Sequence, residues 1–185
     1  MKGLKTKFIG KNIIHLDKIG STNDYAKKIA DEGCPEGTVV IAQQQTKGRG
    51  RFNRKWVSDR GGLYLSIVLT PKLPVTKLPL LTLAAAEIVV KTIHKLYSLK
   101  AEIKLPNDVL INGKKVCGIL AESVLEIDKL KYVVLGIGIN VNNRVADKIE
   151  GIKVTSIRKE LGKKVSRIDL MNTLLVSVYR SLTLF

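Results

Sequence analysis

The spacing of hydrophobic residues predicts short strands interspersed irregularly with three helices. Apolar side chains recur with a helical period after Ser21, after Pro79 and after Arg167. Elsewhere they form short runs rich in Val, Ile and Leu, which are typical of strands. We predict strands within residues 7–16 and at Thr38–Ala42, Leu63–Leu69, Ala101–Leu105, Val109–Ile111, Val116–Leu120, Val124–Ile127 and Tyr132–Leu135.

The first helix has sequence signals at both ends. Ser21 can act as its N-cap, and Asp24 three residues later completes a pattern like a capping box. Gly33 is a natural end point. The expected buried stripe consists of Tyr25, Ala26, Ile29 and Ala30.

The other two helices are longer. Pro79 suits the first turn of an apolar helix that runs to about Tyr97. The last helix is predicted from Arg167 to Phe185, with one stripe of Leu170, Leu174, Val178 and Leu182. Residues 143–166 are polar and show little regular pattern.

Asn112-Gly113 between two apolar runs predicts a β-hairpin with a type I′ turn. This hairpin would bring Asn107, Asp108 and Lys115 onto neighbouring positions. Because strands and helices do not alternate strictly, we predict an α+β fold with a mixed, largely antiparallel sheet flanked by helices. The length of 185 residues fits a single domain, residues 1–185.

The net charge of the chain indicates the class of its partners but does not identify one partner. The chain has 32 basic and 16 acidic residues, a formal net charge of +16, which favours anionic partners such as nucleotides, nucleic acid or an acidic protein. Cys34 and Cys117 are far apart, which favours a reduced, cytoplasmic setting. The first residues lack the apolar run of a signal peptide, and no apolar stretch is long enough to span a bilayer, so no membrane association is expected.

The segment Gly48–Trp56, here called the arginine loop, concentrates the candidate chemistry. It holds two glycines, Arg49, Arg51, Arg54 and the only tryptophan of the chain, Trp56. Glycines allow close approach of a backbone to a ligand, and arginines bind phosphate and carboxylate. A solvated basic loop is the alternative interpretation. The glycine spacing and the indole favour a binding site for a phosphorylated ligand that carries an aromatic ring.

Two other segments allow both a structural and a functional interpretation. Ser21-Thr22-Asn23 can cap a helix, can bind a polar ring at the helix N-terminus, or can do both. The glycines of Gly136–Asn140 mark either a tight packing point or a close approach of a ligand.

Several common sites are excluded by their missing motifs. Asn53 stands where a third glycine would complete G-x-G-x-x-G, and the sequence has no P-loop, no G-x-S-x-G and no H-E-x-x-H. Two histidines and two separated cysteines make a structural zinc site improbable. Positive charge without an obvious protein nucleophile suits catalysis by positioning and charge neutralisation, as in attack on a phosphate.

Four blocks, in this order, resemble the signature of biotin protein ligases. They are Ser21-Thr22-Asn23, Gln45 with the arginine loop, Lys104–Leu120 and Gly136–Asn140. The family activates biotin with ATP as biotinyl-5′-AMP, releasing pyrophosphate, and then transfers biotin to one lysine of a biotin carboxyl carrier protein. The resemblance implies the biotin–lipoate ligase catalytic domain, a mixed sheet related to class II aminoacyl-tRNA synthetases. It implies biotin, ATP and Mg²⁺ as ligands.

The resemblance also assigns roles by position. Biotin is expected to contact Ser21, Thr22, Gln45, Gly48, Arg49, Gly118, Leu120 and Gly136. Nucleotide contacts are expected from Arg54, Trp56 and Asn140, and Asn107 is expected near the phosphates and the metal. Arg51 and Lys115 match the cations between biotin carboxylate and α-phosphate, and Asp108 matches an acid that could orient or deprotonate the acceptor lysine. No metal ligand in the protein is assigned, since Mg²⁺ binds mainly through ATP phosphates.

The sequence also departs from the family pattern. Leu105 stands where the family usually has Trp. The family's N-terminal DNA-binding domain is not expected, nor therefore DNA binding, and its C-terminal β-barrel-like domain is expected to be absent or truncated. Minimal members are often dimers, which predicts a homodimer. A lipoate ligase of the same superfamily and a non-enzymatic nucleic-acid-binding module are the alternatives.

Overall fold

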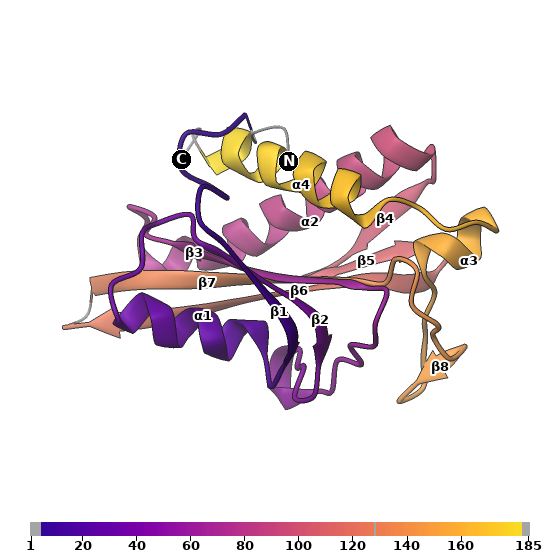
Figure 1. The fold of residues 1–185 in the computed structure, drawn as a ribbon, viewed down its shortest axis with the longest axis horizontal. Coiled ribbons are helices and arrows are strands. Elements are labelled where there is room, and N and C mark those ends of the chain that lie inside the picture. The colour runs from indigo at the N-terminus through magenta and orange to yellow at the C-terminus, as the bar shows by residue number, and fades with distance from the viewer. Residues whose placement is uncertain (1–4, 128, 183–185) are drawn as a thin grey trace.

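A seven-stranded sheet forms the centre of the molecule, which a computed structural model describes at residues 5–127 and 129–182 (Figure 1). The strand order is β1-β2-β3-β7-β6-β5-β4. The strands are β1 (Ile13–Ile19), β2 (Val39–Gln45), β3 (Leu63–Leu69), β4 (Ala101–Lys104), β5 (Asp108–Ile111), β6 (Lys114–Glu126) and β7 (Lys129–Ile139).

Most neighbouring strands of this sheet are antiparallel. Only β1 and β2 pair in parallel, joined through the helix between them, and the remaining pairs are antiparallel. The predicted mixed, largely antiparallel sheet is therefore confirmed. The longest pairing joins β6 to β7, which form one hairpin where we had predicted several shorter strands.

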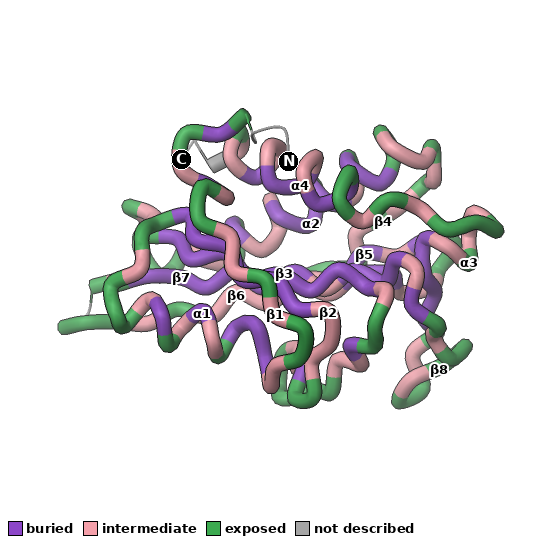
Figure 2. The backbone as a smooth tube through the Cα atoms, viewed as in Figure 1, coloured by how far each residue is buried: buried purple, intermediate pink, exposed green. Residues whose placement is uncertain are grey.

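Helices cover both faces of the sheet, as Figure 1 shows. Helices α2 (Leu78–Tyr97) and α4 (Arg167–Leu182) lie over one face, where the larger apolar core is buried. Helix α1 (Thr22–Asp31) lies on the opposite face, where Ala26 and Ile29 pack against Val134 in a smaller apolar cluster. Figure 2 shows buried residues concentrated in the sheet between these layers.

Local signals in the sequence located several elements correctly. Strand β3 has the predicted bounds, and Pro79 lies in the first turn of α2. Asn112 and Gly113 both have positive φ, 51° and 69°, as a type I′ turn requires. In α4, Leu170, Leu174 and Val178 are buried as predicted, whereas the expected continuation to Phe185 falls on residues 183–185, outside the described part.

The predictions near the N-terminus are confirmed only in part. The strand expected within residues 7–16 begins only at Ile13, because a turn closed by the Lys11 N–H on the Phe8 carbonyl, with Gly10 at φ 73°, precedes it. Ser21 occupies the N-cap position of α1, but its side chain makes no capping hydrogen bond. Asp24 pairs with Arg49 instead of completing a capping box.

Residues 143–166 are more regular than predicted. They contain the hairpin of β8 (Lys148–Ile149) and β9 (Ile152–Lys153) and the short helix α3 (Ile157–Leu161). The β8–β9 hairpin lies below the sheet in the view of Figure 1. Short 3₁₀ turns occur at Arg51–Asn53 and Val75–Lys77. None of the helices in the described residues is long and apolar enough to cross a membrane.

Candidate functional site

A cavity of about 760 Å³ lies on the α1 face of the sheet, beyond the N-terminus of that helix. Side chains alternate between the faces of a strand. Val134 of β7 packs against α1, so Gly136 and Gly138 face the same side and form part of the cavity floor. The start of α1, the arginine loop, the β5–β6 hairpin and the β8–β9 hairpin form the walls.

One end of the cavity presents neutral hydrogen-bonding groups. Gln45 Oε1 accepts hydrogen bonds from the Thr22 N–H at 2.8 Å and from the Thr22 hydroxyl at 3.0 Å. Ser66 Oγ lies 2.8 Å from Thr22 Oγ1 and 2.6 Å from Asn23 Oδ1. Thr22, Asn23 and Ser66 are buried, so this end is desolvated and its geometry is fixed before a ligand arrives. We call it the neutral end.

The glycines of β7 make this packing possible. A Cβ on Gly136 would lie 2.3 Å from Asn23 Oδ1, and one on Gly138 would lie 2.5 Å from Trp56 Nε1. Real Cβ atoms do not approach other atoms so closely, so a larger residue at either position would force Asn23 or Trp56 to move. Gly118 of β6 pairs with Gly138 in register, which widens this strip of bare backbone. The tight-packing interpretation of Gly136–Asn140 is therefore confirmed.

Trp56 lies across this glycine strip. Its ring carbons Cζ3 and Cε3 are 3.3 and 3.5 Å from where a Cβ on Gly118 would be. Lys115 Nζ lies 5.3 Å from the ring centre, in a cation–π contact. The indole N–H is buried and lacks a hydrogen-bond partner among the described residues. Trp56 thus lies between the neutral end and the cations.

The arginine loop folds back on itself as a small hairpin. Its backbone is closed by the Trp56 N–H on the Gly48 carbonyl at 2.9 Å and by the Gly50 N–H on the Arg54 carbonyl at 2.8 Å. A Cβ on Gly48 would lie 2.6 Å from the Trp56 carbonyl oxygen. Arg51 and Arg54 are exposed and line the cavity, and neither forms an ion pair with another described residue.

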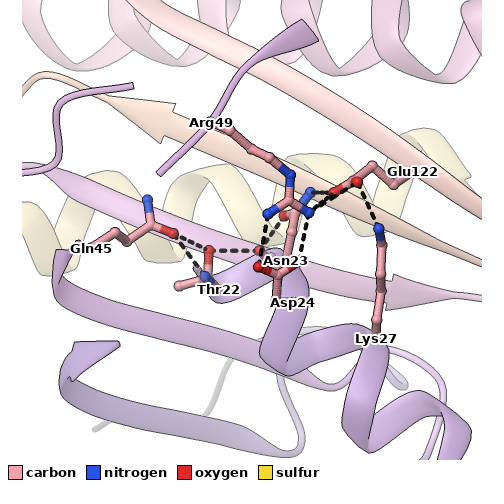
Figure 3. Close-up of polar contacts among 8 residues, drawn as sticks. Thr22, Asn23, Asp24, Lys27, Gln45, Arg49 and Glu122 are labelled. Atoms are coloured by element: carbon pink, nitrogen blue, oxygen red, sulfur yellow. Dashed lines mark hydrogen bonds and ion pairs between the residues drawn. The ribbon is translucent and has the colours of Figure 1, made fainter. Parts of the chain in front are cut away.

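Arg49 points the other way, toward α1 and β6 (Figure 3). Its guanidinium donates to both Asp24 carboxylate oxygens, at 2.8 and 2.6 Å, and to both Glu122 oxygens at 3.0 Å. Glu122 also accepts hydrogen bonds at 2.6 Å from Asn23 Nδ2 and from Lys27 Nζ. We call these five side chains the Arg49 cluster.

The Arg49 cluster shifts the pKa values of its members. Partial burial acts to raise the pKa of Glu122, but the hydrogen bonds from Lys27, Asn23 and Arg49 together outweigh it and lower that pKa below its usual range. The hydrogen bonds to Asp24, followed by the contacts with Glu122, raise the pKa of Arg49 despite its partial burial. Both groups are therefore held in their charged forms.

Lys115 reaches the cavity through a β-bulge. The register between β5 and β6 shifts so that Val109 opposes Cys117 while Leu110 opposes Lys115, which leaves Val116 as the extra residue. Val116 and Cys117 both belong to the core beneath α2 and α4. The bulge therefore turns Lys115 to the cavity side, the same side as Gly118.

Lys115 forms an ion pair with Asp108, with Nζ 2.7 Å from Oδ1. The two side chains are 17% and 21% exposed, so the pair is partly desolvated. Asn107, next to Asp108, donates through Nδ2 to the Ile119 carbonyl at 2.8 Å, which fixes the start of β5 over β6. The predicted proximity of Asn107, Asp108 and Lys115 is confirmed.

The β8–β9 hairpin forms the wall next to Lys115. The Thr155 N–H donates to the Lys115 carbonyl at 2.9 Å, which ties the hairpin to β6. This wall is mixed: Val145, Ala146, Ile149 and Ile152 contribute apolar groups, and Arg144, Glu150 and Lys153 contribute charged ones. Asn140 lies at its base, and Asn140 Oδ1 accepts a hydrogen bond from Asn143 at 3.0 Å.

The cavity brings together every predicted site residue except Gly48, which supports the arginine loop from behind. Their assignment to biotin or ATP stays a prediction. The prediction named Asn23 only within the segment Ser21-Thr22-Asn23, and it missed Lys27, Ser66 and Glu122 as members of the site's polar network. Glu122 could have been found, since it follows Gly118 and Leu120 with the period of two that selects one face of a strand.

The described residues do not offer a protein cage for a metal ion. No group of three or more His, Cys, Asp or Glu side chains within residues 5–127 and 129–182 is arranged to hold one. Mg²⁺ commonly binds through one or two carboxylates and substrate phosphates. Asp108, the carboxylate closest to the predicted cations, is engaged by Lys115, so we assign no step to a metal.

Comparison with known proteins gives consistent matches. The profile of the biotin/lipoate A/B protein ligase family matches residues 16–140. The chain is 43% identical over 177 residues to the bifunctional ligase/repressor BirA of Bacillus spizizenii, covering 94% of this chain and 54% of that protein. It is 39% identical over 128 residues to the biotin–[acetyl-CoA-carboxylase] ligase of Mycobacterium tuberculosis, covering 66% of this chain and 46% of that protein. The chain thus spans about half the length of these curated relatives.

Solved structures resemble the fold closely. The biotin protein ligase of Aquifex aeolicus in complex with biotin and ATP matches with a TM-score of 0.80 and 35% identity, over 94% of this chain and 71% of that one. The biotin protein ligase of Leishmania major in complex with biotinyl-5-AMP matches with a TM-score of 0.77 and 26% identity, over 95% and 76%.

Proposed function

Because the chain belongs to the biotin/lipoate A/B protein ligase family, we propose that it carries the catalytic site of a biotin–protein ligase. The proposed reaction has two steps. A carboxylate oxygen of biotin attacks the α-phosphorus of ATP, and pyrophosphate leaves with the bonding electrons. The amine of an acceptor lysine then attacks the acyl carbon of biotinyl-5′-AMP, AMP leaves, and the amine loses a proton.

One observation carries the proposal, namely the division of the cavity into a neutral end and a cationic end. The neutral end offers donors and acceptors from Thr22 and Gln45, which suit the ureido ring of biotin. Lys115 and Arg51 line the other end, where the biotin carboxylate would meet the α-phosphate. Because those anions repel each other, fixed cations are needed to bring them together and to neutralise the charge that develops in the transition state.

The residues of this chain would then divide the work as follows. Thr22 and Gln45 orient the ureido ring of biotin, and Trp56 lies between that ring and the carboxylate chain of biotin. Arg51 and Lys115 neutralise the carboxylate and the phosphate, while Arg54, Asn107 and Asn140 contact the nucleotide. Asp108 would orient the acceptor amine and accept its proton. Mg²⁺ would enter with the phosphates of ATP and add positive charge there.

Calorimetric titration of biotin and Mg-ATP, separately and together, tests the proposal. We expect biotin to bind alone and reaction heat to appear when both are present, with biotinyl-5′-AMP as product. A parallel titration with lipoate should show weaker binding, because lipoate lacks the ureido group that the neutral end would bind. Binding of lipoate in preference to biotin would overturn the assignment.

The acceptor and the assembly are separate proposals. We propose that the acceptor is a biotin carboxyl carrier protein, which mass spectrometry would detect as a single biotinylated lysine. We further propose a cytoplasmic homodimer. Strands β1 and β4 end the sheet with one hydrogen-bonded neighbour each, which is a common surface for pairing. Light scattering that shows only monomer at tens of micromolar would contradict the dimer.

A further inference from the structure

The arginine loop is joined to the body of the protein by a small number of side chains. Two backbone hydrogen bonds close the loop on itself, between Gly48 and Trp56 and between Gly50 and Arg54. Arg49 is the residue whose side chain hydrogen-bonds from the loop to α1 and to β6. The position of the loop over the cavity therefore depends on Arg49 at its start and on Trp56, which packs over Gly118 and Gly138, at its end.

The Arg49 cluster is neutral as a whole. Asp24 and Glu122 contribute two negative charges, and Arg49 and Lys27 contribute two positive ones. The guanidinium is already paired with two carboxylates and is only 22% exposed, so it offers little net charge to an incoming anion. This distinguishes Arg49 from Arg51 and Arg54, which line the same cavity without an acidic partner among the described residues.

The cluster also contacts the neutral end. Asn23 donates to Glu122 through Nδ2, and its Oδ1 lies 2.6 Å from Ser66 Oγ, beside Thr22 (Figure 3). Gly136 leaves the space that Asn23 occupies. A continuous set of contacts therefore connects the cavity floor, Asn23, Glu122 and Arg49.

We propose that Asp24 and Glu122 are positioning residues, which hold the arginine loop over the cavity through Arg49 and thereby set how fast bound biotin leaves. The part that concerns biotin rests on the proposed function. The part that concerns the loop does not, because it refers to the protein without ligand. Two measurements test the two parts separately.

The first measurement uses Trp56, the only tryptophan, as a reporter of the loop in the ligand-free chain. Acrylamide, which is uncharged, would quench its fluorescence. If Asp24→Asn or Glu122→Gln releases the loop, the quenching constant should rise about twofold or more. Asp24 has a side chain that is 56% exposed, so this variant is expected to fold even if Glu122→Gln does not.

Two further variants serve as controls. Glu32→Gln removes the same charge at the C-terminal end of α1. Glu32 forms an ion pair with Lys28 at 3.9 Å, so this variant should leave the quenching constant unchanged. Asp24→Glu keeps the charge and should restore wild-type quenching. If the quenching constant of Trp56 in Asp24→Asn equals that in Glu32→Gln, the loop is not held by this cluster and the proposal fails.

The second measurement is the dissociation rate of biotin from the same proteins. We expect Asp24→Asn to speed dissociation about two- to fivefold, as for loss of one partly exposed ion pair. Glu122→Gln should speed it about tenfold, because it removes the carboxylate that Lys27 and Arg49 share and leaves Arg49 with Asp24 alone. Single-turnover adenylation at saturating biotin and ATP should change little. An unchanged rate of biotin dissociation in both variants would overturn the proposal. If the wild-type protein fails to bind biotin, the proposed function is overturned instead, and the quenching test still applies.

Discussion

The two ends of the cavity are built on different parts of the fold. The neutral end combines the first residues of α1 with the side chain of Gln45 and with Ser66 of β3, and most of its polar groups are buried and already hydrogen-bonded. The cationic end places Arg51 and Arg54 on an exposed loop, with Lys115 on β6 as its most buried cation. A neutral ring can be bound by a preorganised desolvated surface, whereas anions that repel each other need cations. Arg51 and Arg54 lack an acidic partner among the described residues, and Lys115 would exchange its pairing with Asp108 for the arriving anions.

The largest effect is expected from removing cations at the cationic end. Lys115→Ala or Arg51→Ala should slow adenylation by about 3 kcal/mol, or more than a hundredfold, because each removes a transition-state donor. ATP–pyrophosphate exchange measures this rate. Neither variant should unfold the protein, and Lys95→Ala on the exposed face of α2 is the matched control. Wild-type exchange in either variant would remove that residue from the catalytic set.

The next effect tests whether the neutral end depends on its glycine floor. Gly136→Ala would place a Cβ 2.3 Å from Asn23 Oδ1, so Asn23 must move. Overpacking of this kind typically costs about 1–3 kcal/mol of the free energy of unfolding. Urea denaturation and biotin titration should both show the loss. Gly20→Ala, whose added Cβ would have only Lys47 Cδ at 4.0 Å, should change neither.

A smaller effect isolates hydrogen bonding at the neutral end. Thr22→Val keeps the shape of the side chain and removes the hydroxyl that donates to Gln45 and contacts Ser66. We expect about 1–2 kcal/mol weaker biotin binding with unchanged ATP binding, since the lost group lies at one end only. Thr46→Val, an exposed position one residue beyond β2, is the control. Equal losses for biotin and ATP would contradict the separation of the two ends.

The smallest effect is a pH dependence of stability that originates in the Arg49 cluster. Glu122 faces Lys27, Arg49 and Asn23, with Asp24 on the far side of the guanidinium. Its pKa is lower in the folded protein than the ordinary 4.5, so its contribution to stability is complete above about pH 5 and is lost as the pH falls through the folded-state pKa. The difference in unfolding free energy between wild type and Glu122→Gln should be constant from pH 5 to 7 and should shrink in acid. A difference that grows on acidification would contradict this sign.

Much of the fold follows from local rules that the sequence displays. The turn at Asn112-Gly113 has one favoured geometry, and the apolar period around Pro79 leads to a buried helix. The β8–β9 hairpin and α3 could not be predicted in this way, because they are short and are held by contacts with β6 and by the Ser156 N-cap. Such contacts have no periodic signature.

The site was predicted better in its composition than in its geometry. Resemblance identified Lys115, but strict alternation from Gly118 would have placed its side chain in the core, and only the bulge at Val116 turns it to the cavity. The resemblance gives Arg49 and Arg51 different ligands, but nothing in the sequence shows that one is paired with acids and the other is not. They differ because Asp24 and Glu122, far apart along the chain, both reach Arg49.

The register pairing of Gly118 with Gly138 has a consequence for the dynamics of the molecule. These residues lie on β6 and β7, in the interior of the sheet, where amide hydrogens are expected to exchange with solvent only on global unfolding. The arginine loop that covers them should exchange through local opening. Occupation of the cavity would slow exchange at residues 48–56 by suppressing local opening, and exchange at the floor by stabilising the folded chain against global unfolding. Amides on the two sides of one cavity would therefore report on two different opening reactions.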